Sequence, residues 1–227
     1  MGEDLRGFIK SRVEAANAPG LLRLAFHDAG TFCKKTNTGG VGASVMNPEE
    51  LQRPVNDGLQ KSVNLIQRLH SEGPEYSVAD YIAMAGAVAV EITGGPVIEI
   101  SLSRVDVNSP APDGRLPDEH DDAKKLLSTF ERMGLDTKDL VVLSGAHTLG
   151  DAEDKPFTDN RLEFDNSYFK NLLKADLPKH LGRFKSDEAL LTVDEMKSLV
   201  EKYASDKEAF FADFTKAYVK MTELGFS

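Results

Sequence analysis

Apolar residues recur at helical spacing along most of the chain, which predicts a mainly α-helical protein of about ten helices. The predicted helices cover residues 3–16, 21–30, 54–70, 81–92, 121–133, 136–145, 166–173, 193–204 and 206–224. Only residues 97–102 have strand character, and Gly and Pro clusters separate several of the segments. The connections are too short for a flexible linker, so we expect one domain over residues 1–227.

Composition is typical of a soluble globular protein, since 41% of the 227 residues are hydrophobic and 28% are charged. The formal net charge of −10 disfavours nucleic acid and anionic membranes as partners. No apolar run approaches the roughly 20 residues of a membrane span. One cysteine, Cys33, excludes an intramolecular disulfide and suits a reducing compartment. The N-terminus has no signal or transit features, so we expect either a cytosolic protein or a mature form that has lost its targeting segment.

The segment 21–30 predicts a short buried helix, because leucine and alanine favour helices and Gly30 favours a helix end. Arg23 and His27 are four residues apart and therefore share one face, with Phe26 beside them. Charge on an apolar helix is costly unless a partner lies opposite, so this pair indicates a functional site. The alternative, from these residues alone, is a helix end with an arginine reaching solvent and a histidine with an ordinary hydrogen bond.

A second histidine, His147, follows a predicted helix that ends at Gly145. The glycines around it leave one side of the ring open, although a histidine at a helix C-terminus most often complements the helix dipole. The other histidines are not paired at i, i+4 or His-x-His spacing, which disfavours a multi-histidine zinc or di-iron site. These three are His70, His120 and His180.

The two histidine segments together resemble the signatures of the plant-type haem peroxidases, and the similarity extends over nearly the whole chain. The run from Arg23 to His27 is similar to the distal Arg-x-x-aromatic-His motif of that family, and residues 143–148 are similar to its proximal haem-ligand motif. Asn56 and Asp187 also stand at family-like positions.

The resemblance is to class I, the intracellular ascorbate peroxidase group, because paired cysteines are absent. Phe26, in place of a distal tryptophan, resembles the plastid ascorbate-peroxidase-related proteins. The resemblance implies a mainly α haem-dependent peroxidase fold with haem b between two lobes. The distal lobe would cover about residues 1–117 and the proximal lobe about residues 118–227.

The resemblance further implies that hydrogen peroxide is reduced to water with electrons from a small-molecule donor, in response to oxidative stress. His27 is expected to move a proton between the peroxide oxygens, because its ordinary pKa lies near neutral pH. Arg23 is expected to stabilise the developing negative charge. Asn56 resembles the residue that accepts the other imidazole N–H, with Glu50 as its support.

On the proximal side, the resemblance implies that His147 binds the haem iron and that Asp187 accepts its N–H. Phe157 stands where many class I enzymes have tryptophan. Phenylalanine is hard to oxidise, so we expect the second oxidising equivalent to stay on the porphyrin. The other residues that the resemblance places in the haem pocket are Pro19, Arg115, Leu116, Pro117, Leu143, Ser144 and Phe184.

Five further positions resemble the proximal monovalent-cation site of the family: Thr148, Thr158, Asn160, Glu163 through its backbone oxygen, and Asp165. Oxygen ligands suit a hard cation, so the expected ion is potassium, with calcium as the alternative. The alternative to a cation site is a polar loop rich in turn-forming residues. Asp28 falls where secreted peroxidases bind a distal calcium, but without an evident completing loop we expect it to form hydrogen bonds at the helix end.

The donor side departs from the ascorbate peroxidases. The loop 150–157 is shorter than theirs and lacks the arginine that holds ascorbate, and Ala15 and Asn17 replace a lysine and a cysteine. We therefore expect ascorbate to bind poorly and a phenol or another small reductant to serve as donor. The acidic residues added in this loop are Asp151, Glu153 and Asp154.

The main alternative is a catalytically retired relative that binds haem or has a structural role, and the joint retention of the site residues argues against it. A globin-like oxygen carrier is disfavoured because a distal Arg–His pair promotes cleavage of the O–O bond. Cys33, beside two lysines, is either a redox-sensitive thiol or, more simply, a bystander. The expected compartment is the chloroplast for a mature form, or the cytosol, and the sequence does not define the oligomeric state.

Overall fold

Helices account for most of the described chain, as the spacing of apolar residues predicts. The computed structural model describes residues 4–226. Its α-helices are α1 (Leu5–Lys10), α2 (Ala18–Ala29), α3 (Pro48–Leu51), α4 (Gln60–Glu72), α5 (Val78–Ile92), α6 (Ala123–Met133), α7 (Thr137–Ser144), α8 (Ser167–Leu172), α9 (Lys185–Ala189), α10 (Asp194–Ser205) and α11 (Lys207–Met221). Its 3-10 helices are η1 (Ala15–Asn17), η2 (Ser44–Met46), η3 (Pro54–Asn56) and η4 (Gly145–Thr148), and β1 (Asp151–Ala152) pairs antiparallel with β2 (Lys155–Pro156). The prediction of a mainly α fold is confirmed.

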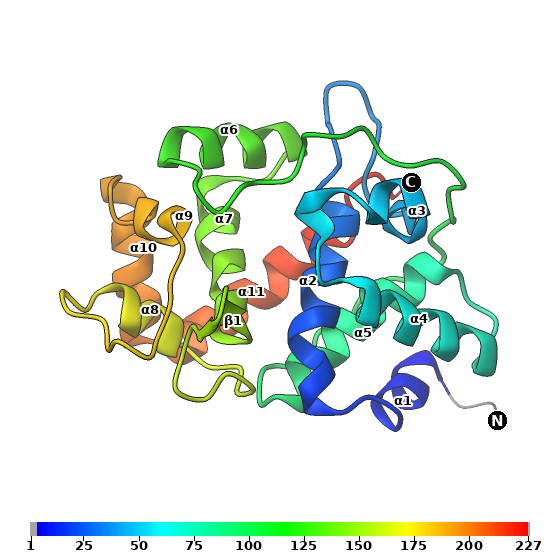
Figure 1. Cartoon of the computed structure of the whole chain (residues 1–227), viewed down its shortest axis with the longest axis horizontal. Coiled ribbons are helices and arrows are strands. Elements are labelled where there is room, and N and C mark those ends of the chain that lie inside the picture. The colour runs from blue at the N-terminus through cyan, green and yellow to red at the C-terminus, as the bar shows by residue number, and fades with distance from the viewer. Residues whose placement is uncertain (1–3, 227) are drawn as a thin grey trace.

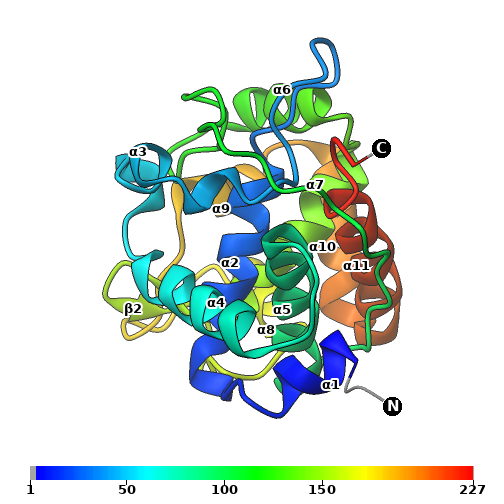
Figure 2. The same ribbon diagram turned by 90° about the vertical axis from the view of Figure 1, so that its right-hand side faces the viewer.

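The packed pair α2 and α5 forms the centre of a first group of helices, α1 to α5 (Figures 1 and 2). Small residues on α5 let the two helices approach closely. A Cβ atom at Gly86 would lie 2.9 Å from the Cβ of Ala25 and would clash with the hydroxyl of Tyr218. Because the interior leaves no room for extra atoms here, α2 is held firmly along its length.

A second group, α6 to α10, lies beside the first, and α11 runs from one group toward the other (Figure 1). Helix α11 packs on α7 and α10, and its Phe214 ring meets the ring of Phe164 at a centroid distance of 4.8 Å. At its other end the hydroxyl of Tyr218 donates to the carbonyl of Ala83 in α5, at 2.8 Å. These contacts join the two groups of helices and fix the space between them.

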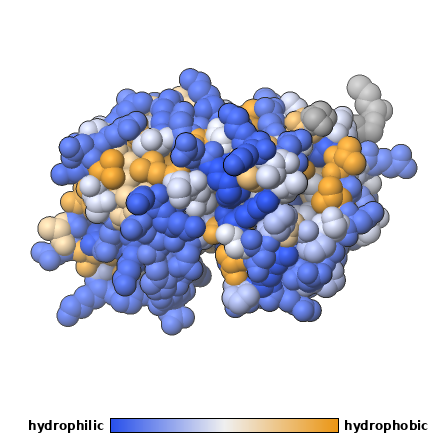
Figure 3. Space-filling view, turned by 90° about the horizontal axis from the view of Figure 1, so that it is seen from above, coloured by the Kyte–Doolittle hydropathy of each residue, from blue (hydrophilic) through white to orange (hydrophobic). Residues whose placement is uncertain are grey.

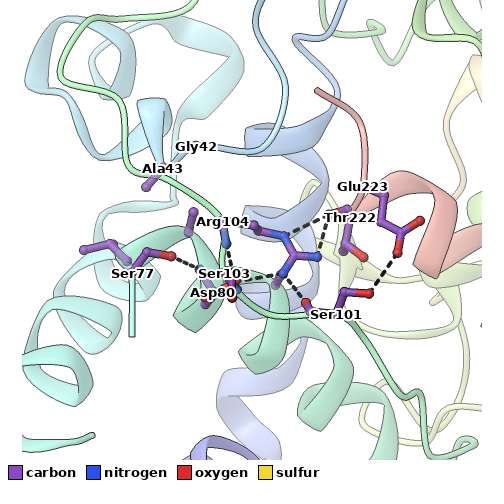
Figure 4. A network of polar contacts seen from close by, with 12 residues as sticks. Gly42, Ala43, Ser77, Asp80, Ser101, Ser103, Arg104, Thr222 and Glu223 are labelled. Atoms are coloured by element: carbon purple, nitrogen blue, oxygen red, sulfur yellow. Dashed lines mark hydrogen bonds and ion pairs between the residues drawn. The ribbon is translucent and has the colours of Figure 1, made fainter. Parts of the chain in front are cut away.

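A buried ion pair fastens the C-terminal end of α11 to the start of α5 (Figure 4). Nη1 of Arg104 lies 2.9 Å from Oδ1 of Asp80, and the two residues are only 2% and 1% exposed. The same guanidinium donates from Nε and Nη2 to the carbonyl of Thr222, at 2.9 and 2.6 Å. Since a buried charge is costly without partners, these bonds together determine where the segment around Arg104 lies.

Three segments differ from the predicted elements. Helix α1 is shorter than predicted and ends at Lys10, and residue 3 lies outside the described range. The predicted helix 54–70 is divided between η3 and α4, because Gly58 has a φ of +84° that interrupts a continuous helix. The predicted strand 97–102 is wrong: the segment is extended but pairs with no strand within residues 4–226, and its Ile98 is buried in the core instead.

The molecular surface seen from above is mostly hydrophilic, with hydrophobic groups in small separate patches (Figure 3). Among residues 4–226, no helix is both long enough and apolar enough to cross a lipid bilayer.

Candidate active site

A cavity of about 1110 Å³ lies between the two groups of helices. Arg23, Phe26 and His27 of α2 line one wall, and His147 of η4 lines the opposite side together with Leu143. The volume is slightly above the range of about 300–1,000 Å³ that is typical of small-molecule and cofactor sites. The two histidines that the sequence singled out therefore face one space.

On the α2 wall, His27 is oriented by a chain of buried hydrogen bonds. Its Nδ1 lies 2.7 Å from Oδ1 of Asn56, and Nδ2 of Asn56 donates to the carbonyl of Glu50 at 2.8 Å. The Glu50 carboxylate in turn accepts the backbone N–H of Ala111, at 2.6 Å. Because the amide nitrogen of Asn56 is already committed as a donor, its oxygen accepts from His27, and Nδ1 carries the ring proton. Nε2 is then the nitrogen with a lone pair.

Burial, together with the nearby Arg23 cation, lowers the pKa of His27 to about 3. The imidazole is therefore neutral over the whole physiological pH range. Burial also lowers the pKa of Arg23, which nevertheless stays charged. Its guanidinium donates to the carbonyls of Asp57 and Val55, at 2.6 and 2.9 Å, so the cation is held in a fixed position on the wall.

On the opposite side, His147 is held by a carboxylate. Its Nδ1 lies 2.8 Å from Oδ1 of Asp187, which is 2% exposed, and Oδ2 of Asp187 accepts the backbone N–H of Phe184 at 2.8 Å. The ring of Phe157 stacks on the imidazole with a centroid distance of 4.5 Å and an interplanar angle of 5°. The side chain of His147 stays 37% exposed because it faces the cavity. With Nδ1 engaged, Nε2 is again the available nitrogen.

A residue that the sequence did not single out completes this cluster. The hydroxyl of Tyr168 donates to Oδ1 of Asp187 at 2.7 Å, and its ring meets His147 edge-on at a centroid distance of 5.7 Å. Burial raises the pKa of Tyr168 well above its ordinary value, and the adjacent Asp187 carboxylate raises it further. Nothing local in the sequence predicts this contact, because Tyr168 lies in a short helix 19 residues before Asp187.

The five positions of the candidate cation site lie in one connected stretch of polar contacts. The hydroxyl of Thr148 donates to Asp165 Oδ1 at 2.9 Å and to the carbonyl of Glu163 at 3.3 Å. Thr158 donates to the carbonyl of Thr148 at 3.0 Å, whereas Asn160 turns its side chain to the Glu163 carboxylate, also at 3.0 Å. Hydrogen bonds therefore link Thr148, Thr158, Glu163 and Asp165 directly, while the side chain of Asn160 is bonded to the Glu163 carboxylate.

The other predicted pocket residues divide into two sets. Pro19, Pro117, Leu143, Ser144 and Phe184 line the cavity. Arg115 and Leu116 are not among its lining residues. The guanidinium of Arg115 donates to the carbonyls of Thr31 and Thr38, both at 2.9 Å, and Leu116 lies against Gly30. The turn that holds Arg115 is fixed by Arg132, which donates to the carbonyls of Arg115 and Gly30.

Two further residues from the sequence analysis lie outside the cavity lining. Asp28 accepts the backbone N–H groups of Gly42 and Ala43 on Oδ2, both at 3.1 Å, and burial raises its pKa to about 6. Cys33 is half-buried, and a hydrogen bond from Thr36 lowers the pKa of its thiol. Asp28 thus anchors the following loop to the end of α2.

The mouth of the cavity carries an ion pair that the sequence analysis did not predict. Nη1 of Arg161 lies 3.0 and 2.9 Å from the two carboxylate oxygens of Asp151, and both residues line the cavity. Glu153, Asp118 and Glu119 add further carboxylates to the lining. Arg161, which follows the shortened loop in the sequence, is therefore already paired with an anion.

Comparison with known proteins agrees with this arrangement. A family model described as peroxidase matches residues 3–206. The peroxisomal L-ascorbate peroxidase 5 of Arabidopsis thaliana is 44% identical over 99% of this chain and 81% of its own length. The cytosolic L-ascorbate peroxidase 2 of the same plant is 44% identical over 98% of this chain and 90% of its own. The cytosolic L-ascorbate peroxidase 1 of Oryza sativa subsp. japonica is 43% identical over 94% of this chain and 88% of its own length.

Proposed function

The chain belongs to the peroxidase family, and from this membership we propose that it holds haem b between His27 and His147 and reduces hydrogen peroxide with electrons from a small-molecule donor. The observation that carries the proposal is the symmetry of the two histidines. Each has Nδ1 bonded to a side-chain oxygen, which leaves Nε2 for chemistry in the cavity that both rings line.

The cavity residues fit a flat, largely apolar group with an iron atom. Leucine, phenylalanine and proline side chains form much of the lining, and His147 offers an imidazole nitrogen of the kind that binds haem iron. The carboxylate of Asp187 on its Nδ1 fixes the ring and makes it more basic. Haem would supply the exchange of electrons with peroxide and donor.

The α2 wall supplies proton transfer. His27 takes a proton from one oxygen of hydrogen peroxide at Nε2 and delivers it to the other oxygen, which leaves as water. Its depressed pKa keeps it neutral before the reaction, so the lone pair is always available, and makes release of the proton favourable afterwards. Arg23, fixed by two carbonyls, stabilises negative charge on the departing oxygen. Retention of the whole set disfavours the alternative of a catalytically retired relative.

Two variants test this assignment in the haem-loaded protein. His27→Leu is expected to keep haem but to slow the optical reaction with peroxide severely, whereas His147→Ala is expected to lose the histidine-bound haem spectrum. His120→Ala, in an exposed histidine outside the cavity lining, is the matched control and should do neither. A parent-like peroxide reaction in His27→Leu, or a parent-like haem spectrum in His147→Ala, would refute the corresponding role.

We further propose that the donor is a neutral or cationic small molecule, such as a phenol, in preference to ascorbate. The relatives are named for ascorbate, which is an anion at neutral pH. In this chain Arg161 is paired with Asp151, and Glu153, Asp118 and Glu119 add negative charge to the lining of the same cavity. An anionic donor is therefore repelled at this edge, and the repulsion should weaken with salt.

Releasing Arg161 from its partner tests the donor assignment. Asp151→Asn should lower the KM for ascorbate by about 2- to 5-fold, as expected for one partly exposed charge, and leave a neutral phenol nearly unaffected. The double variant with Arg161→Gln should remove that gain. If ascorbate already serves the parent better than phenols do, or if the gain persists without Arg161, the donor proposal is wrong.

For the residues around Thr148 we propose a potassium ion, with calcium as the alternative. Support comes from the hydrogen bonds that bring together the hydroxyls of Thr148 and Thr158, the Glu163 carbonyl and the Asp165 carboxylate. Hard oxygen atoms of this kind suit such cations. Potassium should raise the unfolding temperature relative to an equal concentration of tetramethylammonium, and Asp165→Asn should remove the difference; equal unfolding temperatures in the parent protein would contradict the site.

For the compartment, we infer an intracellular location. The relatives carry the words cytosolic and peroxisomal in their names, which supports the predicted cytosol and gives no support to the predicted chloroplast. Fractionation of cells that express the tagged natural protein would decide between the compartments.

A further inference from the structure

We propose that Tyr168 is a redox-active residue of this peroxidase, which gives up an electron while Asp187 takes its phenolic proton. The second oxidising equivalent then resides on Tyr168 and not on the porphyrin, where the sequence analysis placed it. The inference rests on the proposed binding of haem by His147. Tyr168 already contacts both Asp187 and His147. It is 2% exposed, its hydroxyl lies 2.7 Å from Oδ1 of Asp187, and its ring is packed edge-on against His147.

The chain leaves few other candidates for this role. It contains no tryptophan and five tyrosines, and the phenylalanine stacked on the other side of His147, Phe157, is too hard to oxidise. Tyrosine becomes a strong acid when it loses an electron, so it needs a proton acceptor at hydrogen-bond distance. Tyr81 and Tyr218 donate to backbone carbonyls, which are poor proton acceptors, whereas Tyr168 donates to a carboxylate.

The geometry of the buried pair suits the step. The hydroxyl of Tyr168 already donates to Oδ1 of Asp187 at 2.7 Å, and both side chains are shielded from water. The proton can therefore move along an existing hydrogen bond without rearrangement of the two side chains. The other Asp187 contacts, from His147 Nδ1 and the Phe184 N–H, keep the carboxylate in place while the proton moves.

Electrons and protons balance over one turnover. Hydrogen peroxide takes up two electrons and two protons and becomes two molecules of water. Before the donor reacts, haem would supply one of these electrons and Tyr168 the other, and the proton of Tyr168 rests on Asp187. The small-molecule donor then supplies two electrons and two protons in total. One electron restores Tyr168, which recovers its own proton from Asp187, and the other restores the haem group.

The chain offers a matched control at Tyr203. This tyrosine is also buried, and its hydroxyl also donates to a carboxylate, Asp213 at 3.1 Å. Among the rings of residues 4–226, that of Tyr203 packs against Phe169 and Phe210 and not against His147. Tyr203 therefore has the same proton acceptor chemistry without the contact to the proposed iron ligand.

The experiment is freeze-quench electron paramagnetic resonance on the haem-loaded protein after one equivalent of hydrogen peroxide without donor. The parent protein should give a radical signal that narrows when ring-deuterated tyrosine is incorporated. The signal should disappear in Tyr168→Phe and remain in Tyr203→Phe. The labelled parent protein itself provides a test that needs no substitution, because its high-field spectrum should show the g-values of a hydrogen-bonded tyrosyl radical.

Three outcomes would overturn the inference. A signal that does not respond to tyrosine deuteration, or one that persists in Tyr168→Phe, assigns the electron to another group. If peroxide is consumed but no tyrosyl signal forms in the parent protein, Tyr168 is not oxidised although the peroxidase proposal stands. If the haem-loaded protein does not consume peroxide at all, the peroxidase proposal fails and this inference fails with it.

Discussion

Replacing Asn56 by alanine tests whether the orientation of His27 matters for the reaction with peroxide. Asn56 is 2% exposed and His27 is 7% exposed, so water cannot readily replace the 2.7 Å bond between Nδ1 and the amide oxygen. The substitution leaves a buried N–H without its acceptor. It also removes the preference for the tautomer whose Nε2 lone pair faces the cavity.

The structure sets the size of the expected effect. Leaving a buried donor unpaired costs about 1–3 kcal/mol, and the reacting tautomer loses this amount relative to the alternative. At 1.4 kcal/mol per factor of ten, the rate constant for the reaction with peroxide should fall by roughly 5- to 150-fold. The haem content should stay that of the parent protein, because Asn56 does not line the cavity.

Stopped-flow absorbance of the haem-loaded protein, mixed with peroxide in the absence of donor, measures this rate constant. The matched control is Asn166→Ala, because Asn166 is also buried and donates to backbone carbonyls, at Tyr203 and Ala204, outside the cavity lining. The control should lose a similar amount of stability and keep the parent rate constant. A rate constant for Asn56→Ala within about twofold of the parent would refute the orienting role.

Three further predictions concern stability. The folded state raises the pKa of Asp28 from 3.8 to about 6, so the folded protein binds this proton more tightly than the unfolded chain does. Lowering the pH from 8 to 5 should therefore stabilise the parent protein relative to Asp28→Asn by about 1.4 kcal/mol, measured by urea titration. If the stability difference between the two proteins does not change with pH, the pKa shift is contradicted. Arg104→Met should cost about 3–5 kcal/mol of unfolding free energy, since it leaves the carboxylate of Asp80 buried and unpaired, and a loss below about 1 kcal/mol would mean that water reaches the pair. Gly86→Ala should lower the unfolding free energy by about 1–3 kcal/mol through contact with Ala25 and Tyr218, and a neutral result would show that α2 and α5 can separate.

The fold class could be predicted from the sequence because helical spacing of apolar residues is a local signal. Helices such as α7 and α10 differ from their predicted ranges by only a few residues. The failures occurred where local signals are ambiguous. Residues 97–102 alternate like a strand, but only tertiary contacts could reveal that no partner strand lies beside them within residues 4–226. The division near residue 117 into two lobes stays a prediction.

The candidate site was predictable to the extent that its residues lie in recognisable motifs. Arg23 and His27 are one turn apart on one helix, and both line the cavity. Arg115 illustrates the limit: its position was predictable, but its direction depends on the hydrogen bonds that Arg132 donates across the turn. Tyr168 and Arg161 were missed because a single tyrosine in a short helix, or a single arginine in a polar loop, carries no signal of what it will contact.

The central claim is that haem lies between the two histidines, with His147 as the iron ligand and His27 as the residue that transfers the proton of the peroxide. A crystal structure of the haem-loaded protein tests it most directly. We predict electron density for a flat porphyrin in the cavity between α2 and η4, with the iron bonded to Nε2 of His147 and with His27 on the opposite face at a non-bonding distance. Iron bonded to His27, or a porphyrin bound anywhere outside this cavity, would contradict the account.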